Sequence, residues 1–458
     1  MPYRTAIQRI LSLTDFERGT AGPNPRRRYD LSRMERLLAR VGSPHLQVPA
    51  VHVTGTKGKG SVAAMLSSIG QASGLKTGLY TSPHLHSFCE RIQLNNQPIS
   101  EDLFASLVDQ LWPHVEEMNK QDPDGPVTTF ELLTTMAFLC FHEAKCDLQV
   151  LEVGLGGKLD ATNVIKAPKA CVITSISLDH TQVLGDTVEL IAQDKSGIIK
   201  PGAAVVTAPQ QPGALQVIQQ AAKKQGVKLV NVADRYRTSM IETDLNGQTF
   251  YIAGLNDEYR IHMPLLGRHQ LENAACAVGV FEEVGVRIGL TREGMIKGFA
   301  NVNWPARLEV IQRQPLVVID GAHNPYSMRV IGESLQEYLP HHRTFLLVGL
   351  TLGHDIAGIV EQAVKLEPLI VFATQSRHPR SVPVKQVADL FRAHDVKVIE
   401  APTVDQAAKL ALAEAGRADL VLGTGSLFIA AELREVLKGI PPELYPEIEK
   451  PHAAQRTV

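Results

Sequence analysis

The segment "TGTKGKGS", residues 54–61, places three glycines, two lysines and a terminal serine directly after the apolar run "PAVHV". A strand that ends here and feeds the helical pattern "SVAAMLSSIGQASG" would aim backbone N–H groups and a helix N-terminus at a phosphate-sized anion. Lysine would add charge beside the phosphates, and the Ser61 hydroxyl could reach Mg²⁺. The spacing departs from GxxxxGK[ST], because Gly60 separates Lys59 from Ser61. The segment predicts an ATP site; a flexible glycine turn between a strand and a helix is the alternative.

Two further segments carry possible metal ligands at predicted strand ends. Glu152 ends an apolar run in "LEVGLGGKLDATN", and His180 follows another in "SISLDHTQ". We expect these neighbouring strand ends to face the phosphate loop, since parallel strands present their carboxyl ends at one sheet edge. The pair predicts a Mg²⁺ site, although histidine is an unusual ligand for so hard a cation. Taken alone, His180 is more simply a core or surface histidine.

The elements that would position these residues follow an α/β pattern from residue 48 onward. Apolar runs that predict strands of a parallel sheet alternate with amphipathic segments: "PAVHV", "KTGLYT", "DLQVLEV", "ACVITSI" and "GAAVVTA". Between residues 228 and 265, "RTSMIETD", "QTFYIAG" and "YRIHMPL" are separated by Asn-Gly and Asn-Asp turn signals, which predicts a small antiparallel excursion. Helical spacing returns in "HQLENAACAVGVFEEVG".

A second alternating series predicts a smaller, Rossmann-like α/β domain at the C-terminal end. Its strands would be "PLVVIDGAHN", "RTFLLVGL", "LIVFATQS", "VKVIEA" and "DLVLGTGS". We expect the boundary near Trp304-Pro305, where proline interrupts a helix. Residues 1–303 would then form the N-terminal and central ATP-binding domain, residues 304–440 the C-terminal domain, and residues 441–458 a polar tail.

Composition narrows the class of protein. Of 458 residues, 44% are hydrophobic and 21% charged, and the formal net charge is -2, so the basic excess typical of nucleic-acid binding is missing. No stretch approaches the 18 apolar residues of a membrane span, and charges break the first apolar run too often for a secretory signal, so we expect a cytosolic protein without a membrane partner. Five scattered cysteines without CxxC spacing predict buried free thiols rather than a zinc site.

Nine motifs occur in one order along the chain: "TGTKGKGS", "YTSPHLHSFCERI", "TTFELLT", "LEVGLGGKLDATN", "SISLDHTQVLG", "DKSGIIKPG", "GRHQLENA", "WPARLE" and "DGAHNP". In these motifs the sequence resembles the folylpolyglutamate synthase and dihydrofolate synthase family of the Mur ligase superfamily. The resemblance implies a P-loop ATPase domain followed by a glutamate ligase domain. It also implies an ATP-dependent, ADP-forming ligase that adds L-glutamate to a folate carboxylate through an acyl phosphate.

The resemblance also implies roles for single residues. ATP would be bound by Thr56, Lys57, Gly58, Lys59, Gly60, Ser61, Asn273, Arg307 and Asp320, with Asn273 on the adenine side. The ligands of two Mg²⁺ ions would be Ser61, Ser82, Glu152, His180 and Lys195, the last as a carbamate. Catalytic residues would be Lys195, His180 and His323. A carbamate gives lysine the oxygen ligand that a bare ammonium lacks; a solvated helix lysine is the alternative at residue 195.

Folate contacts in the family map onto three short segments. They are Tyr29, Asp30 and Leu31; Thr128, Thr129, Phe130 and Glu131; and Leu159, Asp160 and Ala161. The chain departs from the family pattern at Lys158, where arginine is common, and at Ala306, where glycine is common. The segment "GLTLGHDI" lacks the lysine-aspartate pair that often stands there.

Four functions remain open at this point. We favour a bifunctional enzyme that adds glutamate to dihydropteroate and then to folates, acting as a monomer. A synthase of folylpolyglutamate alone is the second reading. A Mur-type ligase acting on cell-wall precursors or on a poly-amino acid is the third, and a nucleotide-operated switch that never makes an amide is the fourth.

Overall fold

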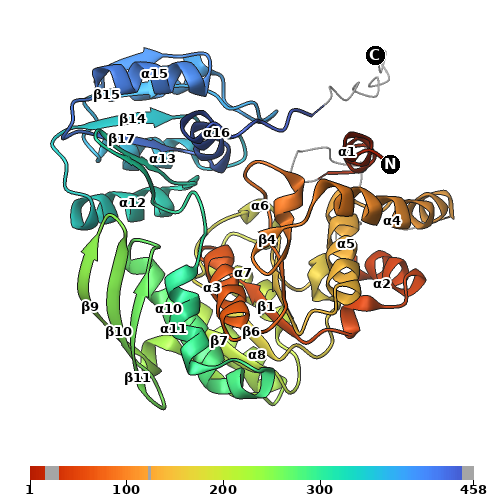
Figure 1. Ribbon diagram of the computed structural model, residues 1–458. Coiled ribbons are helices and arrows are strands. Elements are labelled where there is room, and N and C mark those ends of the chain that lie inside the picture. The colour runs from red at the N-terminus through yellow and green to blue at the C-terminus, as the bar shows by residue number, and fades with distance from the viewer. Residues whose placement is uncertain (16–29, 122–124, 446–458) are drawn as a thin grey trace.

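A computed structural model of the chain describes residues 1–15, 30–121 and 125–445. Within these residues, the strands form an eight-stranded sheet, a three-stranded sheet and a six-stranded sheet (Figure 1). We call them the first sheet, the small sheet and the second sheet. Tyr29 and the tail beyond residue 445 lie outside the described residues.

The first sheet has the order β4-β3-β2-β5-β1-β6-β7-β8. It is parallel from β2 to β8, while β3 and β4 add an antiparallel edge. Its strands are β1 (Ala50–Thr54), β2 (Thr77–Tyr80), β3 (Ile92–Leu94), β4 (Gln97–Pro98), β5 (Leu148–Glu152), β6 (Ala170–Ile173), β7 (Ala204–Thr207) and β8 (Leu229–Asn231). Every residue of β1 and β5 is buried, as expected for central parallel strands.

Helices cover both faces of this sheet. They are α1 (Tyr3–Leu11), α2 (Leu31–Arg40), α3 (Lys59–Ala72), α4 (Glu101–Gln121), α5 (Thr129–Glu143), α6 (Thr181–Leu184), α7 (Val188–Lys195), α8 (Pro212–Lys224), α9 (Val232–Arg235), α10 (Arg268–Val284) and α11 (Arg292–Asn301). On the face of Val51 and Val53 lie α3, α10 and α11. Helix α11 approaches α3 closely, because a Cβ on Gly298 would stand 2.5 Å from Cα of Ile69. This packing fixes the helix that starts at the phosphate loop.

The small sheet is antiparallel, with the order β11-β10-β9. Its strands are β9 (Arg237–Asp244), β10 (Gly247–Ala253) and β11 (Glu258–Met263). Alternate residues of β11 are buried, so one face packs on the core of α10 and α11 while the other faces solvent.

The second sheet has the order β12-β13-β17-β14-β15-β16 and is parallel except for β12. Its strands are β12 (Glu309–Arg313), β13 (Leu316–Ile319), β14 (Thr344–Val348), β15 (Ile370–Ala373), β16 (Val398–Glu400) and β17 (Leu420–Thr424). Its helices are α12 (Pro325–Tyr338), α13 (Ile356–Val364), α14 (Val384–Arg392), α15 (Val404–Glu414) and α16 (Leu427–Lys438). The first three pack on one face and the last two on the other.

The α/β class and the order of the predicted strands are confirmed, and three details of the prediction are wrong. The antiparallel excursion begins at Arg237, since Leu229–Asn231 still belongs to the first sheet. Trp304-Pro305 interrupts no helix, because α11 already ends at Asn301. The strands that lead to Glu152 and His180 are not neighbours: β1 lies between β5 and β6.

The end of the described chain returns to its beginning (Figure 1). The Tyr3 hydroxyl lies 3.0 Å from Oε2 of Glu443 and donates to this carboxylate. His84 Nε2 lies 2.9 Å from the Tyr445 hydroxyl, and the Tyr445 ring packs edge-on against Phe88. The segment after α16 therefore packs on α1 and on the loop that follows β2.

In the described part of the chain, no helix is both long and apolar enough to cross a bilayer. The five cysteines all lie in described residues, and each is a buried free thiol. The prediction of buried thiols is therefore confirmed.

Candidate active site

The phosphate loop connects β1 to α3 at the carboxyl edge of the first sheet. The N–H groups of Thr56 and Lys57 donate to the carbonyl of Ser175, at 2.8 and 3.2 Å, which ties the first half of the loop to the segment after β6. Gly58 has φ +89° and caps the helix, and the first helical bond runs from Val62 N–H to its carbonyl. The N–H groups of residues 58–61 therefore precede the helical ladder and stay available to an anion.

Glu152 ends β5, beside the phosphate loop strand, and is 5% exposed. Its Oε2 accepts a hydrogen bond from the backbone N–H of Ser82 at 3.3 Å. Burial raises the pKa of Glu152 to about 6, against the opposing charges of Lys59 and Arg307. A buried carboxylate with so little hydrogen bonding fits a cation as its partner. Ser82 and Glu152 are thus brought together as expected.

The described residues contain no group of three or more His, Cys, Asp or Glu side chains placed to hold a metal. A cation at Glu152 would therefore take most of its ligands from hydroxyls, phosphate oxygens and water. That donor set suits Mg²⁺, which keeps several waters and binds through one or two carboxylates and substrate phosphates.

Lys195 is the last residue of α7 and is 3% exposed. Its Nζ donates to the carbonyl of Gly55 at 2.7 Å, so the side chain lies directly against the phosphate loop. Burial, together with the charge of Lys59, lowers the pKa of Lys195 to about 7. A large share of the amine is therefore neutral near pH 7, and the neutral amine is the form that can take up carbon dioxide.

Asp179 joins the phosphate loop to the C-terminal part of the chain. Its Oδ2 lies 2.9 Å from Lys57 Nζ and accepts from Asn324 Nδ2 at 3.1 Å. Burial opposes its ionisation, yet the charge of Lys57 helps to hold the pKa of Asp179 well below its usual range. The carboxylate is therefore ionised and binds both partners.

His323 completes this contact, and its hydrogen bonds define its tautomer. Its Nδ1 lies 2.8 Å from the carbonyl of Gly321, which can only accept, so Nδ1 carries the proton. Its Nε2 then accepts from Lys57 Nζ at 3.0 Å. Burial holds the pKa of His323 well below its usual range, in keeping with a neutral ring.

His180 lies at the rim of the site with φ +50° and a side chain that is 50% exposed. Its Nε2 stands 4.0 Å from Asp179 Oδ1, and its ring centroid 6.3 Å from that of His354. His354 in turn lies 5.0 Å from the His323 ring. Among the described residues, His180 contacts Asp179 and His354 and not Glu152, so a metal shared by His180 and Glu152 stays a prediction.

Arg307 sits between two residues in left-handed conformation, Ala306 with φ +56° and Leu308 with φ +48°. The left-handed backbone gives a reason for glycine in relatives at the position of Ala306, since glycine adopts it without strain. Asp320 accepts from the N–H groups of Leu308 and Ala322, both at 2.8 Å. Asp320 therefore holds the loop around Arg307, and its direct contact with nucleotide stays a prediction.

Asn273 lies at the phosphate loop. A Cβ on Gly58 would stand 2.3 Å from Asn273 Oδ1. Asn273 Nδ2 donates to Gln270 Oε1 at 2.9 Å, and Gln270 Nε2 lies 3.4 Å from the Ser61 hydroxyl. Asn273 therefore lies against the phosphate loop, and its contact with the adenine side of ATP stays a prediction.

Four of the predicted folate residues serve the local structure. Asp30 caps α2 and Thr128 caps α5, where Glu131 completes a capping box. Glu131 also forms a buried ion pair with Arg33 at 2.9 Å. Asp160 accepts from the N–H groups of Leu155 and Thr162, at 3.0 Å each.

The remaining folate residues divide by exposure. Thr129 and Ala161 are buried and Leu31 and Phe130 are half-buried, whereas Leu159 is exposed. The ring of Phe130 packs on Gly154, where a Cβ would stand 2.6 Å from it. Folate contact through any of these residues stays a prediction.

The sequence analysis missed Asp179, Asn324 and His354. Two of them adjoin residues chosen for the site, since Asp179 precedes His180 and Asn324 follows His323. His354 lies in "GLTLGHDI", which drew attention only for the pair it lacks. Their contacts join segments far apart in sequence, such as Asp179 and Asn324.

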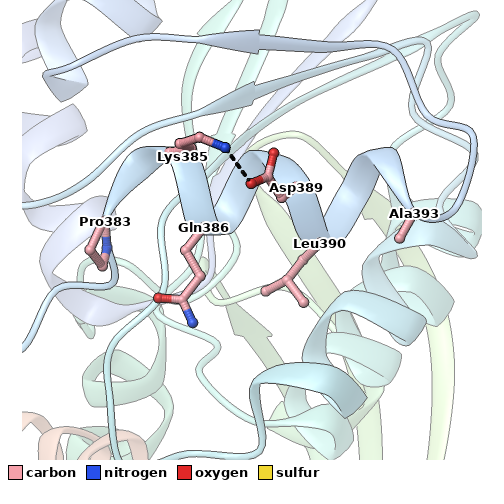
Figure 2. A pocket seen from close by; sticks show the side chains of 6 residues that line it. All are labelled: Pro383, Lys385, Gln386, Asp389, Leu390 and Ala393. Atoms are coloured by element: carbon pink, nitrogen blue, oxygen red, sulfur yellow. Dashed lines mark hydrogen bonds and ion pairs between the residues drawn. The ribbon is translucent and has the colours of Figure 1, made fainter.

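A hollow of about 500 Å³ lies along α14, away from these residues (Figure 2). Its walls are Pro383, Lys385, Gln386, Asp389, Leu390 and Ala393. Lys385 and Asp389 pair across it at 2.9 Å, so it offers no free charge to a nucleotide. The strand ends, and not this hollow, define the candidate active site.

Two family models match the chain in sequence. The Mur ligase middle domain matches residues 53–281, and the Mur ligase glutamate ligase domain matches residues 306–427. These two domains in this order define the class of Mur-type ligases.

Individual relatives narrow the class. The dihydrofolate synthase/folylpolyglutamate synthase of Bacillus subtilis is 35% identical over 89% of this chain and 95% of its own length. A folylpolyglutamate synthase of Mycobacterium tuberculosis complexed with ADP superposes with a TM-score of 0.85 at 30% identity, over 96% of this chain and 100% of that one. E. coli FolC in complex with DHPP and ADP gives 0.81 at 26% identity, over 96% and 98%. The chain belongs to the folylpolyglutamate synthase and dihydrofolate synthase family.

Proposed function

We propose that this protein joins L-glutamate to folate carboxylates at the expense of ATP, and that it accepts both dihydropteroate and reduced folates. The observation that carries this proposal is the docking of the His323–Asn324 loop onto the phosphate loop through Lys57 and Asp179. A phosphate loop alone would suit a switch, whereas this contact brings a second domain to the phosphates, as a ligase with a reactive intermediate requires.

In the first step, a carboxylate oxygen of the folate attacks the γ-phosphorus of ATP. The bond to ADP breaks, and an acyl phosphate forms. Lys59 and Arg307 neutralise the phosphate charge, since Lys57 is already paired with Asp179. Glu152 and Ser82 would hold Mg²⁺, which when bound supplies further charge neutralisation. The protein contributes position and charge rather than a covalent intermediate.

In the second step, the amine of L-glutamate attacks the acyl carbon and phosphate leaves. The amine must lose a proton. His323 is neutral and keeps its own proton on Nδ1, so Nε2 is the basic nitrogen. When Lys57 releases Nε2 and keeps its pair with Asp179, Nε2 is free to take that proton.

We further propose that Lys195 is carbamylated and holds a second Mg²⁺ beside the phosphate loop. Its burial, its contact with Gly55 and its lowered pKa support this modification. The carbamate would place an anionic oxygen where the bare lysine places a cation. A monomeric state and a cytosolic location stay predictions.

The test is ADP release by purified protein with ATP, Mg²⁺ and L-glutamate, run in parallel with 7,8-dihydropteroate and with tetrahydrofolate, and with products identified by mass spectrometry. A gain of one glutamate on both acceptors is the expected result. A gain on tetrahydrofolate alone would limit the activity to polyglutamylation. ADP release without either product would reject the proposal.

A further inference from the structure

His86 joins the loop of Ser82 to helix α16. Its side chain is 9% exposed, and its Nδ1 lies 3.2 Å from Glu435 Oε1. Its Nε2 lies 3.0 Å from Arg434 Nη1. Because arginine can only donate, Nε2 is the acceptor, and the proton of the neutral ring sits on Nδ1 and is donated to Glu435. One imidazole thus contacts two consecutive side chains of α16.

Arg434 also reaches the joint that carries Arg307. Its Nε donates to both oxygens of Glu309 at 3.2 Å each. Oε2 of Glu309 accepts from the backbone N–H of Ala306 at 2.9 Å, and Oε1 accepts from Lys438 at 2.8 Å. The exposed fractions of Arg434 and Glu309 are 15% and 18%, so solvent screens this contact only in part.

Arg307 is therefore framed by two carboxylates that hold its neighbours. Glu309 binds the N–H of Ala306, and Asp320 binds the N–H of Leu308. Both neighbours have positive φ, a conformation that L-residues keep only where their surroundings hold them. Releasing Glu309 would relax the backbone that aims Arg307.

We infer that Arg434 is a positioning residue, which sets the loop of Ser82 and the segment of Arg307 together. The inference rests on the proposed function, in which Ser82 lies on the magnesium side of the nucleotide and Arg307 on the phosphate side. Helix α16 does not need Arg434 to stay in place, because its Ser426 cap and its buried apolar face already anchor it. The Arg434 guanidinium thus links the loop of Ser82 to the segment of Arg307 and lies outside the nucleotide site itself.

Arg434→Met tests the inference, because methionine keeps an apolar stem and removes every donor. We expect the dissociation constant of ADP with Mg²⁺, measured by calorimetry, and the KM for ATP to rise by about tenfold, and kcat to fall by about 10- to 100-fold. The matched control is Arg392→Met, which removes an arginine paired with Asp389 and Glu400 at the far edge of the same domain. This control should leave nucleotide binding unchanged.

A double-mutant cycle with His86→Ala tests the coupling itself. If Arg434 and His86 act as one unit, the double variant binds ADP no more weakly than the weaker single variant. The inference would be overturned if the increases in the ADP dissociation constant of the two single variants multiply in the double variant. It would also be overturned if Arg434→Met binds ADP as tightly as Arg392→Met does. If the wild-type protein binds ADP but joins no glutamate, the proposed function is rejected. The double-mutant cycle measured by ADP binding would still show whether Arg434 and His86 are coupled.

Discussion

At the scale of single residues, the site depends on charges that are buried next to the phosphate loop. Lys195 and Glu152 are both nearly inaccessible, and burial moves the pKa of each toward neutrality. Lys57 and Asp179 are paired instead: Lys57 helps to hold the pKa of Asp179 well below its usual range, and Asp179 opposes the lowering of the Lys57 pKa by burial. The paired side chains, Lys57 and Asp179, thus hold the fold, whereas the buried side chains, Lys195 and Glu152, remain for ligands.

Lys195→Ala is expected to abolish ligation while ADP still binds, because the variant loses the oxygen ligand that a carbamate would supply. A short-chain carboxylic acid should restore part of the activity, whereas added bicarbonate should not. Steady-state ligation rates and ADP calorimetry measure both effects. Lys200→Ala is the matched control, since Lys200 also donates to a backbone carbonyl, that of Gly197 at 2.9 Å. Full activity of Lys195→Ala would exclude the carbamate.

Glu432 on α16 gives a prediction with a pH dependence. Burial raises the pKa of this carboxyl to about 7, although it accepts from the Arg377 N–H at 2.6 Å. A raised carboxyl pKa means that stability is highest at low pH and falls as the pH rises from the unfolded value near 4.5 through 7. Glu432→Gln should therefore raise the free energy of unfolding by about 3 kcal/mol at pH 8 and by only about 1 kcal/mol at pH 5.

Urea unfolding of the Glu432→Gln variant and the wild-type protein at the two pH values measures this difference. Glutamine keeps an oxygen acceptor for the Arg377 N–H, so the hydrogen bond itself is preserved. An equal gain at both pH values would show that ionisation of Glu432 has no part in it.

At the scale of elements, the start of α3 depends on a glycine with left-handed backbone and no room for a side chain. Gly58 has φ +89°, and a Cβ there would meet Asn273 Oδ1 at 2.3 Å. Gly74, just beyond the end of the same helix, has φ +90° and nothing within 4 Å. A side chain at either glycine would therefore meet the same backbone strain, but only the one at Gly58 would also collide with a neighbour.

Gly58→Ala is expected to weaken ADP binding at least about tenfold, because displacement of Asn273 distorts the phosphate loop. Both Gly58→Ala and Gly74→Ala should lower the free energy of unfolding by about 1 kcal/mol through the left-handed conformation. Calorimetry with ADP and urea unfolding separate the two effects. Weakened ADP binding in Gly74→Ala as well would show that strain in α3, and not the contact with Asn273, is responsible.

Buried elements are easier to predict from the sequence than exposed ones. Strands such as β1 and β5 are apolar throughout because both faces are covered, so their runs stand out. The strands β3, β4 and β8 escaped prediction because they are two or three residues long and lie at or near the sheet edges. Site residues at strand ends, such as Glu152, are predictable for the same reason. Contacts between domains, such as Asp179 with Asn324, are not, because no local pattern encodes them.

At the scale of the whole molecule, four side chains connect the phosphate loop to the domain that contains the second sheet. They are Lys57, Asp179, His323 and Asn324. Asp179→Asn would leave the Lys57 ammonium without its counter-charge. We expect the free energy of unfolding to fall by about 3 kcal/mol and the radius of gyration from small-angle scattering to increase, since the domains separate.

Asp419→Asn is the matched control, because Asp419 pairs with Arg343 inside one domain at 2.6 Å. It should lower stability without changing the radius of gyration. A radius of gyration that also stays constant in Asp179→Asn would show that other contacts hold the domains together.

The return of residues 443–445 to α1 and to the loop after β2 has a consequence for biosynthesis. The ribosome makes Tyr3 and His84 long before Glu443 and Tyr445, so these earlier residues wait for their partners while the chain between them is translated. The surface of Phe88 stays uncovered during that time, since the Tyr445 ring is among its aromatic neighbours. A nascent chain stalled before residue 443 therefore leaves this apolar surface open to a chaperone, and the surface is covered only after residue 445 has emerged.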